Sequence, residues 1–142
     1  MTRPKIPKAT RLMVAKRAGN RCEYCKSPME IATQRFHMEH IVPFSKGGES
    51  NSDNLALVCN GCNNHKYNRI KGFDKITSTE VPLFHPRQQL WGDHFAWETD
   101  MAFLIGLTAT GRSTIHTLQL NRPELVSMRR ILIRVHLHPP NS

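Results

Sequence analysis

Four cysteines stand in two pairs, Cys22-Glu-Tyr-Cys25 and Cys59-Asn-Gly-Cys62, and residues 26–58 separate the pairs. Each C-x2-C pair can present two thiolates to one ion, so the two pairs together match a tetrahedral structural zinc site. Two disulfides are the alternative, but no apolar secretion signal opens the sequence, which favours a reducing compartment. A thioredoxin-like role needs a βαβ setting that neither pair has. We therefore expect structural Zn²⁺ bound by all four cysteines.

An acidic residue lies directly beside a histidine in the segment between the cysteine pairs, at Glu39 and His40. A carboxylate is a hard oxygen ligand for a divalent ion, and an imidazole is a candidate general base. Phosphodiester hydrolysis uses both functions, because a base deprotonates water and a cation neutralises the charge that develops on the phosphate. A further ligand can come from a helix that follows the second cysteine pair.

The elements that must position these groups are a strand over residues 33–42, a polar Gly-rich loop over 45–54, a short strand over 55–58 and a helix from about 60 to 70. Pro43 ends the first strand. This order predicts a ββα unit whose helix begins at a cysteine pair. A short helix over 9–18 precedes the unit, while a strand over 101–106 and helices over 112–120 and 123–136 follow it.

The combined string resembles the HNH endonucleases of the ββα-metal (His-Me finger) superfamily. The likeness rests on the segment His37–Pro43, the Gly47-Gly48 pair, Asn54 and the segment Cys59–Lys66, and it covers about residues 20–70. It implies an α+β fold, in which a small ββα-metal nuclease core is clipped by the four-cysteine zinc site and carries an α/β C-terminal extension. We expect a basic N-terminal arm and short helix over 1–20, the HNH core over 21–72, and an extension over 73–142 that packs on the core.

The resemblance also implies roles for single residues. His40 corresponds to the general base, Glu39 to the acidic metal ligand that is more often Asp in the family, and Asn54 to the asparagine that ties the loop and orients the base. Asn63 corresponds to the ligand on the helix. The catalytic ion is then a separate Mg²⁺ or Mn²⁺, since hard oxygen ligands suit these ions. The implied function is a metal-dependent DNA endonuclease.

Several assignments remain open in the sequence. His65 is the rival of Asn63, but the two are about 200° apart on a helix, so both cannot face one ion. His37 alternates with Glu39 on one strand face and could add a ligand. Adjacent Glu39 and His40 would point to opposite faces of a regular strand, so a common site requires a distortion before Pro43.

The charge of the chain favours a nucleic acid partner. It has 20 Lys and Arg against 11 Asp and Glu, a net charge of +9, and such a balance favours a polyanion. Lys66 and Arg69 are candidate phosphate contacts, with a surface charge on the helix as the alternative. The basic residues of an extended arm over 1–11 are further candidates: Arg3, Lys5, Lys8 and Arg11.

We expect duplex DNA as the partner, no membrane association, since no apolar run approaches about 18 residues, and a bacterial or phage-like cytoplasmic setting. A transit peptide is the alternative for the basic N-terminus. The C-terminal extension could contact DNA, form a homodimer or complete the core. The alternative function is a non-catalytic zinc-containing module that binds nucleic acid or protein.

Overall fold

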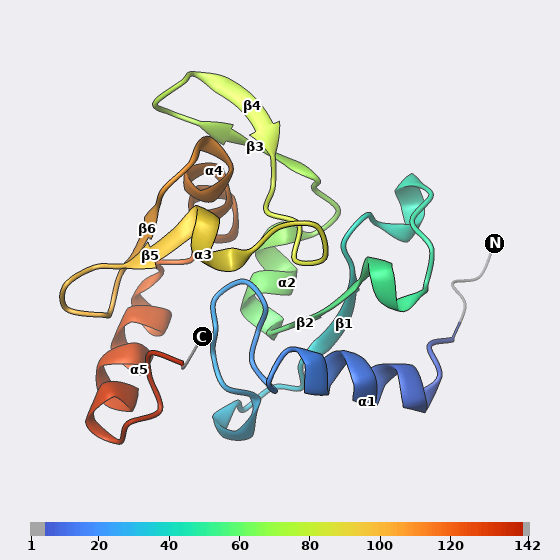
Figure 1. Cartoon of the computed structure of the whole chain (residues 1–142), viewed down its shortest axis with the longest axis horizontal. Helices are drawn as coiled ribbons and strands as arrows, with labels where there is room; N and C mark the ends of the chain where they lie inside the picture. The colour runs from blue at the N-terminus through green and yellow to red at the C-terminus, as the bar shows by residue number, and fades with distance from the viewer. Residues whose placement is uncertain (1–4, 141–142) are drawn as a thin grey trace. The chain divides into compact units, whose positions relative to one another are not determined.

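The computed structural model describes residues 5–140, which form a mixture of short strands and helices (Figure 1). These residues fold as two compact units, residues 5–70 with 85–88 and residues 71–84 with 89–140. Within residues 5–140, no helix combines the length and apolar character that crossing a bilayer requires.

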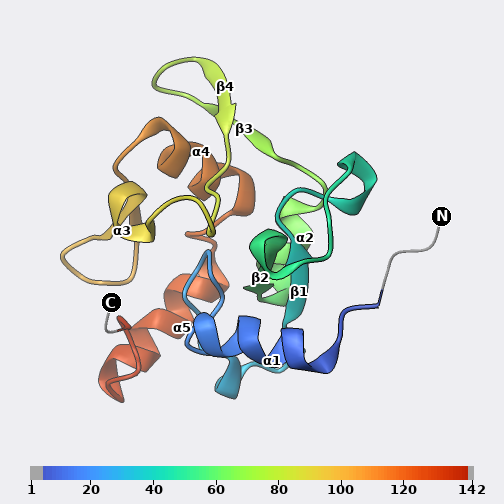
Figure 2. The same cartoon turned by 45° about the vertical axis from the view of Figure 1, so that its right-hand side comes forward.

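The first unit contains the predicted ββα arrangement. Its helices and strands are α1 (Lys8–Arg17), β1 (His37–His40), β2 (Leu55–Val58) and α2 (Asn60–Lys66), with short 3-10 helices at Met29–Ile31, Phe44–Lys46 and Ser52–Asn54. The strands are antiparallel, with Glu39 opposite Ala56 and His40 opposite Leu55. Helix α2 lies beside this strand pair in both Figure 1 and Figure 2. The first strand is shorter than expected, because only residues 37–40 pair with β2.

Helix α1 belongs to the core of this unit. Its Val14 is fully buried and packs with Ile6, Leu55 and Leu57 in one apolar cluster. Burial of such side chains is the main favourable contribution to folding. Helix α1 therefore packs on β2, the strand that pairs with β1.

The expected extended arm is shorter in the structure. Helix α1 begins at Lys8, directly after Pro7, because proline restricts the residue before it but is well tolerated just ahead of a helix. Lys8 and Arg11 are therefore helical, Lys5 precedes the helix, and Arg3 lies outside the described residues. The prediction of an extended segment through residue 11 was wrong on this point.

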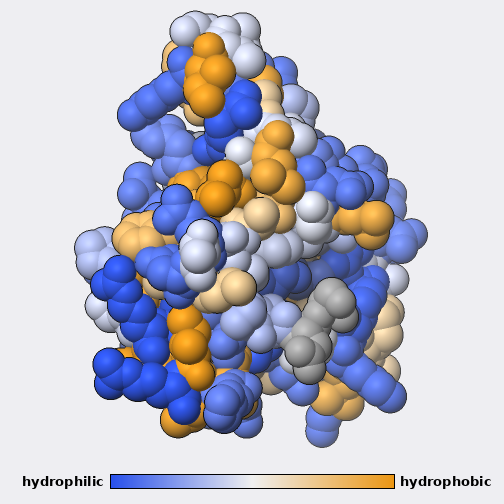
Figure 3. Space-filling model, turned by 60° about the vertical axis from the view of Figure 1, so that its left-hand side comes forward, coloured by the Kyte–Doolittle hydropathy of each residue, from blue (hydrophilic) through white to orange (hydrophobic). Residues whose placement is uncertain are grey.

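The second unit is built from hairpins and helices that surround its own core. Its elements are β3 (Lys71–Asp74), β4 (Thr79–Pro82), α3 (Trp91–His94), β5 (Phe95–Trp97), β6 (Leu104–Gly106), α4 (Ala109–Leu118) and α5 (Pro123–Arg134). The pairs β3–β4 and β5–β6 are antiparallel. Phe84 and Phe95 are buried with an edge-to-face contact at 5.3 Å between ring centroids. On the face drawn in Figure 3, hydrophobic side chains form separate groups among hydrophilic ones.

An ion pair joins the first hairpin of this unit to α4. Arg112 donates from Nε to Asp74 Oδ1 at 2.9 Å and from Nη2 to Asp74 Oδ2 at 3.0 Å. Gly72 allows the close approach of the two elements, since a Cβ atom there would lie 2.3 Å from Thr117 Oγ1 and 2.4 Å from Ser113 Oγ.

The α+β class and the HNH-like core with a mixed extension are confirmed.

Candidate active site

The four cysteines come together in one buried cluster. Their sulfur atoms all lie within 4.8 Å of one another, and Cys25 Sγ is 3.6 Å from Cys59 Sγ. The four cysteines are not joined by disulfide bonds. Four sulfurs about 2.3 Å from a tetrahedral zinc ion would be about 3.8 Å apart, so this group fits the metal. The cysteines are therefore positioned to form a zinc site.

The zinc site is built from a turn and from the start of α2. Cys59 is the N-cap of α2, and its sulfur accepts a hydrogen bond from the Cys62 N–H at 3.4 Å. In the first pair, the Cys25 N–H lies 3.5 Å from Cys22 Sγ. Any ion held here would fix the N-terminus of α2 relative to the turn at Cys22–Cys25, and so fix the helix that carries Asn63.

Glu23 and Arg87 connect the turn of the first cysteine pair to β2, and no sequence signal indicates this role. Glu23 forms two hydrogen bonds with the backbone of Leu57: its N–H donates to Leu57 O and its Oε2 accepts from Leu57 N, each at 2.9 Å. Glu23 Oε1 also pairs with Arg87. Arg87 is far away in the sequence but lies in the same compact unit, and no spacing rule links it to a residue between two cysteines.

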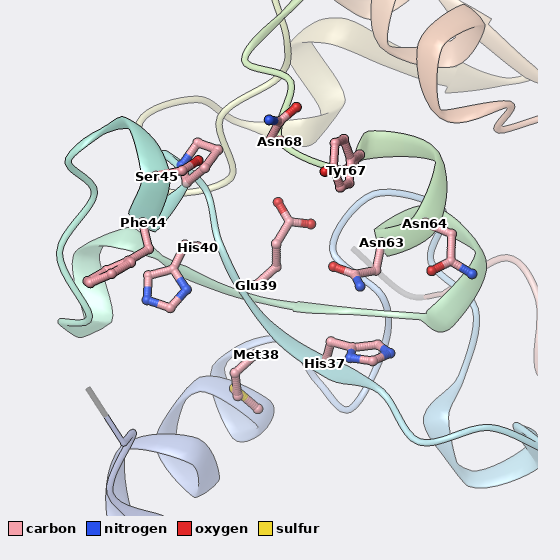
Figure 4. Close-up of a pocket in the computed structure, with 11 residues that line it drawn as sticks. His37, Met38, Glu39, His40, Phe44, Ser45, Asn63, Asn64, Tyr67 and Asn68 are labelled. Carbon is pink, nitrogen blue, oxygen red and sulfur yellow. The ribbon is translucent and has the colours of Figure 1, made fainter. Parts of the chain in front are cut away.

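A pocket of about 490 Å³ opens beside β1 and α2. Figure 4 shows the Glu39 carboxylate pointing into it between His40 and Asn63. The lining residues are His37, Met38, Glu39, His40, Pro43, Phe44, Ser45, Asn63, Asn64, Tyr67 and Asn68. The expected conflict between the faces of Glu39 and His40 is resolved because β1 ends at His40, so the pocket extends around the end of the strand and both side chains line it.

Glu39 is a buried carboxylate held by a buried lysine. Its side chain pairs with Lys66, with Oε1 2.7 Å from Nζ, and the two side chains are 6% and 1% exposed. Lys66 also donates to Ile41 O at 3.1 Å. Glu39 Oε2 has no hydrogen-bond partner among residues 5–140. Burial raises the pKa of the Glu39 carboxyl group to about 7, and the Lys66 ammonium opposes that rise.

This arrangement changes the interpretation of Lys66. From the sequence it is a candidate phosphate contact or a surface charge on the helix. In the structure its ammonium lies inside the unit, against Glu39 and the end of β1. Lys66 therefore does not provide an exposed positive charge for a phosphate. Arg69 is exposed, and its guanidinium donates to His65 O at 3.0 Å.

His40 lies at the other side of the pocket. Its side chain is buried, its Nε2 is 2.8 Å from Ser50 Oγ, and its ring meets the edge of Phe44 at 6.4 Å between centroids. The hydrogen bond at one ring nitrogen determines which nitrogen can accept a proton. Ser50 therefore restrains the His40 ring through its Nε2 atom. The sequence does not single out this serine, because a loop serine carries no spacing signal.

The loop that brings Ser50 to His40 is held by Asn54. The Asn54 amide accepts from Val42 N at 2.9 Å and donates to Val42 O at 3.0 Å and to Glu49 O at 2.8 Å. A Cβ atom on Gly48 would lie 1.8 Å from Val42 O, so only glycine permits this close return of the chain. The loop geometry around the end of β1 therefore depends on both residues.

The comparison with protein families concerns this same segment. Residues 22–69 match the model of a family described as HNH endonuclease. These residues, called the HNH segment below, make up about a third of the chain. No curated protein and no solved structure was found to match the chain. The family match indicates a nuclease kind of activity for the HNH segment, which contains both the zinc site and the pocket.

Of the remaining candidate ligands, Asn63 and His37 line the pocket and His65 does not. Asn63 is half-buried and lines the pocket, whereas His65 does not line it, as expected for side chains about 200° apart on a helix. His37 lines the pocket and its Nε2 is 3.0 Å from Asn60 Oδ1. Glu39 Oε2 and the Asn63 amide oxygen could thus contact a divalent ion as hard ligands, and His37 stays a candidate ligand at the same pocket.

Proposed function

We propose that this protein is a metal-dependent DNA endonuclease that hydrolyses phosphodiester bonds. The observation that supports the proposal most is the pocket of the HNH segment, where a buried histidine and a buried carboxylate line one cavity. Hydrolysis of a phosphodiester needs a base for water and a cation near the phosphate. The pocket has residues suited to both tasks.

His40 acts as the general base in this proposal. It takes a proton from a water molecule, and the hydroxide attacks the phosphorus atom in line with the leaving 3′ oxygen. The buried position of His40 and its contacts with Ser50 and Phe44 restrict the orientation of the ring. Asn54 supports the orientation of the base indirectly, because it holds the loop that carries Ser50. The products carry 5′-phosphate and 3′-hydroxyl ends.

Glu39 and Asn63 would hold the catalytic Mg²⁺ or Mn²⁺. When bound, such an ion supplies positive charge that stabilises the phosphate and the leaving oxygen. The fit is supported by the buried Glu39 Oε2, which has no hydrogen-bond partner among the described residues. Zinc held by the four cysteines would be structural, since four thiolates leave no open coordination position.

DNA is the substrate that the charge of the protein favours. The net charge is +9, and contacts to backbone phosphates supply most of the sequence-independent affinity of DNA-binding proteins. Exposed basic residues of the first unit that could contribute include Lys5, Lys8, Arg11, Lys46 and Arg69. Duplex DNA is the form for which we propose activity.

The test is nicking of supercoiled plasmid with Mg²⁺ or Mn²⁺, with EDTA as a control. We expect His40→Ala to lower the rate about 10²–10⁴-fold, with zinc content and DNA affinity unchanged. His116→Ala is the matched control, because His116 is an exposed histidine on α4 that does not line the pocket. Equal rates for His40→Ala and the parent would refute the assignment. DNA binding without any cleavage by the parent would favour the non-catalytic zinc module.

A further inference from the structure

Tyr67 presents a large aromatic ring to solvent at the edge of the pocket. It directly follows α2 and is 74% exposed, more than any other large hydrophobic side chain among the described residues. It also lines the pocket, and Figure 4 shows it above the Glu39 carboxylate, next to Asn68. Burial of an aromatic ring is normally favourable, so the position of this ring calls for an explanation.

The backbone at Tyr67 holds the ring there at a cost. Its φ of 51° and ψ of −121° lie outside the regions that a bulky residue favours. The preceding residue, Lys66, is fixed by its buried contacts with Glu39 and Ile41 O. The Tyr67 N–H donates to Asn63 O at 2.9 Å. The ring is therefore carried by a backbone tied to both candidate metal ligands, Glu39 and Asn63.

The surroundings of the ring suit a nucleobase. Three amide side chains line the same pocket, those of Asn63, Asn64 and Asn68, and amides pair with the edges of bases. An exposed aromatic face is the usual platform on which an unpaired base stacks, and stacking tolerates any base. In an intact duplex the faces of the bases are covered by their neighbours, so such a platform gains only from a base that leaves the stack.

We propose that Tyr67 stacks on an unpaired nucleobase next to the scissile phosphate, so that the preferred substrate is a duplex that carries an unpaired nucleotide. This inference rests on the proposed nuclease function and specifies its substrate. A base that stacks on Tyr67 positions its phosphate near Glu39 and His40. An intact duplex binds through its phosphates alone and gains nothing from the ring.

The experiment compares variants at position 67 on matched DNA. Tyr67→Asn removes the ring and introduces a residue that is found at positive φ more often than most other non-glycine residues. Tyr67→Phe keeps the ring. Leu12→Gln is the control, since Leu12 is exposed on α1 and does not line the pocket. All proteins carry His40→Ala, and binding is measured in a buffer without divalent cations, so that no cleavage intervenes.

The two substrates are a short duplex and the same duplex with one unpaired 2-aminopurine. We expect Tyr67→Asn to weaken binding of the second substrate by roughly 5- to 150-fold and to leave the intact duplex within about twofold. The fluorescence of 2-aminopurine should be quenched by the parent and by Tyr67→Phe, but not by Tyr67→Asn. Quenching that survives in Tyr67→Asn, or equal losses on both substrates, would overturn the proposal.

Cleavage by the protein with an intact His40 separates this proposal from the proposed function. If the parent cuts neither substrate, the nuclease assignment fails. If the parent and Tyr67→Asn both cut intact and bulged duplexes at equal rates, the nuclease assignment stands and the role of Tyr67 fails. Both proposals are supported if the parent cuts the bulged duplex faster than the intact duplex, and if this preference is lost in Tyr67→Asn and kept in Tyr67→Phe.

Discussion

Replacement of Lys66 by methionine should destabilise the HNH segment strongly. The substitution removes the ammonium from an ion pair whose side chains are 1% and 6% exposed, and it leaves the buried Glu39 carboxylate without its cation. Loss of one partner of a buried pair costs about 3–5 kcal/mol, whereas an exposed pair is worth about 0–1 kcal/mol. Because domains are stable by about 5–15 kcal/mol, we expect Lys66→Met to remove a fifth or more of the stability of this unit.

The assay must report on the unit that contains Lys66. Trp91 and Trp97 both lie in the second unit, so tryptophan fluorescence serves as an internal control and not as the main signal. Hydrogen exchange of the amides in β1, β2 and α2 measures the opening free energy of the first unit directly. Lys46→Met is the matched control, because Lys46 is an exposed lysine of the same unit and should change stability by about 0.5 kcal/mol or less.

A double-mutant cycle decides whether the ion pair is the cause. In a Glu39→Gln background no buried carboxylate is left uncompensated, so Lys66→Met should cost only the lost hydrogen bond to Ile41 O, about 1–3 kcal/mol. If Lys66→Met costs the same with Glu39 and with glutamine in its place, the buried-pair explanation is wrong. A cost no larger than that of Lys46→Met would refute it equally.

Three further predictions concern the zinc site, the base and the second unit. Cys59→Ser should abolish zinc binding and protection of the β1 and β2 amides, because a structural site contributes folding energy; a full equivalent of zinc by elemental analysis would contradict this. Ser50→Ala should lower the cleavage rate about fivefold, the value of one hydrogen bond of roughly 1 kcal/mol; an unchanged rate would remove Ser50 from the site. The Arg112 guanidinium holds the pKa of Asp74 well below its usual range. The stability that this ion pair contributes is therefore fully present above about pH 4 and is lost as the pH falls further. Asp74→Asn should lower the melting temperature at pH 7 and flatten its decline in acid, followed by tryptophan fluorescence; an unaltered acid profile would refute that linkage.

The ββα core could be predicted because local signals agreed with one another. The apolar run Leu55–Val58 and the helix start at the second cysteine pair correspond to β2 and α2. The helical spacing also separated Asn63, which lines the pocket, from His65, which does not. These predictions depend on sequence neighbours and fixed periodicities, which the sequence displays directly.

The elements that escaped prediction depend on contacts between distant residues. The hairpin of β3 and β4 has no strong alternating pattern, and the ion pair of Asp74 with Arg112 joins positions 38 residues apart. Likewise, Ser50 reaches His40 only because Asn54 and Gly48 fold the loop back on Val42. A sequence shows that these residues are polar or small, but not which partner each one meets.

Two adjacent residues at the end of α2 also show burial that the sequence does not predict. Lys66 has the more polar side chain and is almost completely buried, while Tyr67 has the larger apolar surface and is mostly exposed. Composition alone predicts the reverse. Lysine can be buried here because a carboxylate and a carbonyl oxygen meet its ammonium, and tyrosine is exposed because the backbone leaves the helix at positive φ. Lys66 pairs with the Glu39 carboxylate and Tyr67 lines the same pocket, so both exceptions to the usual pattern of burial occur at the candidate site.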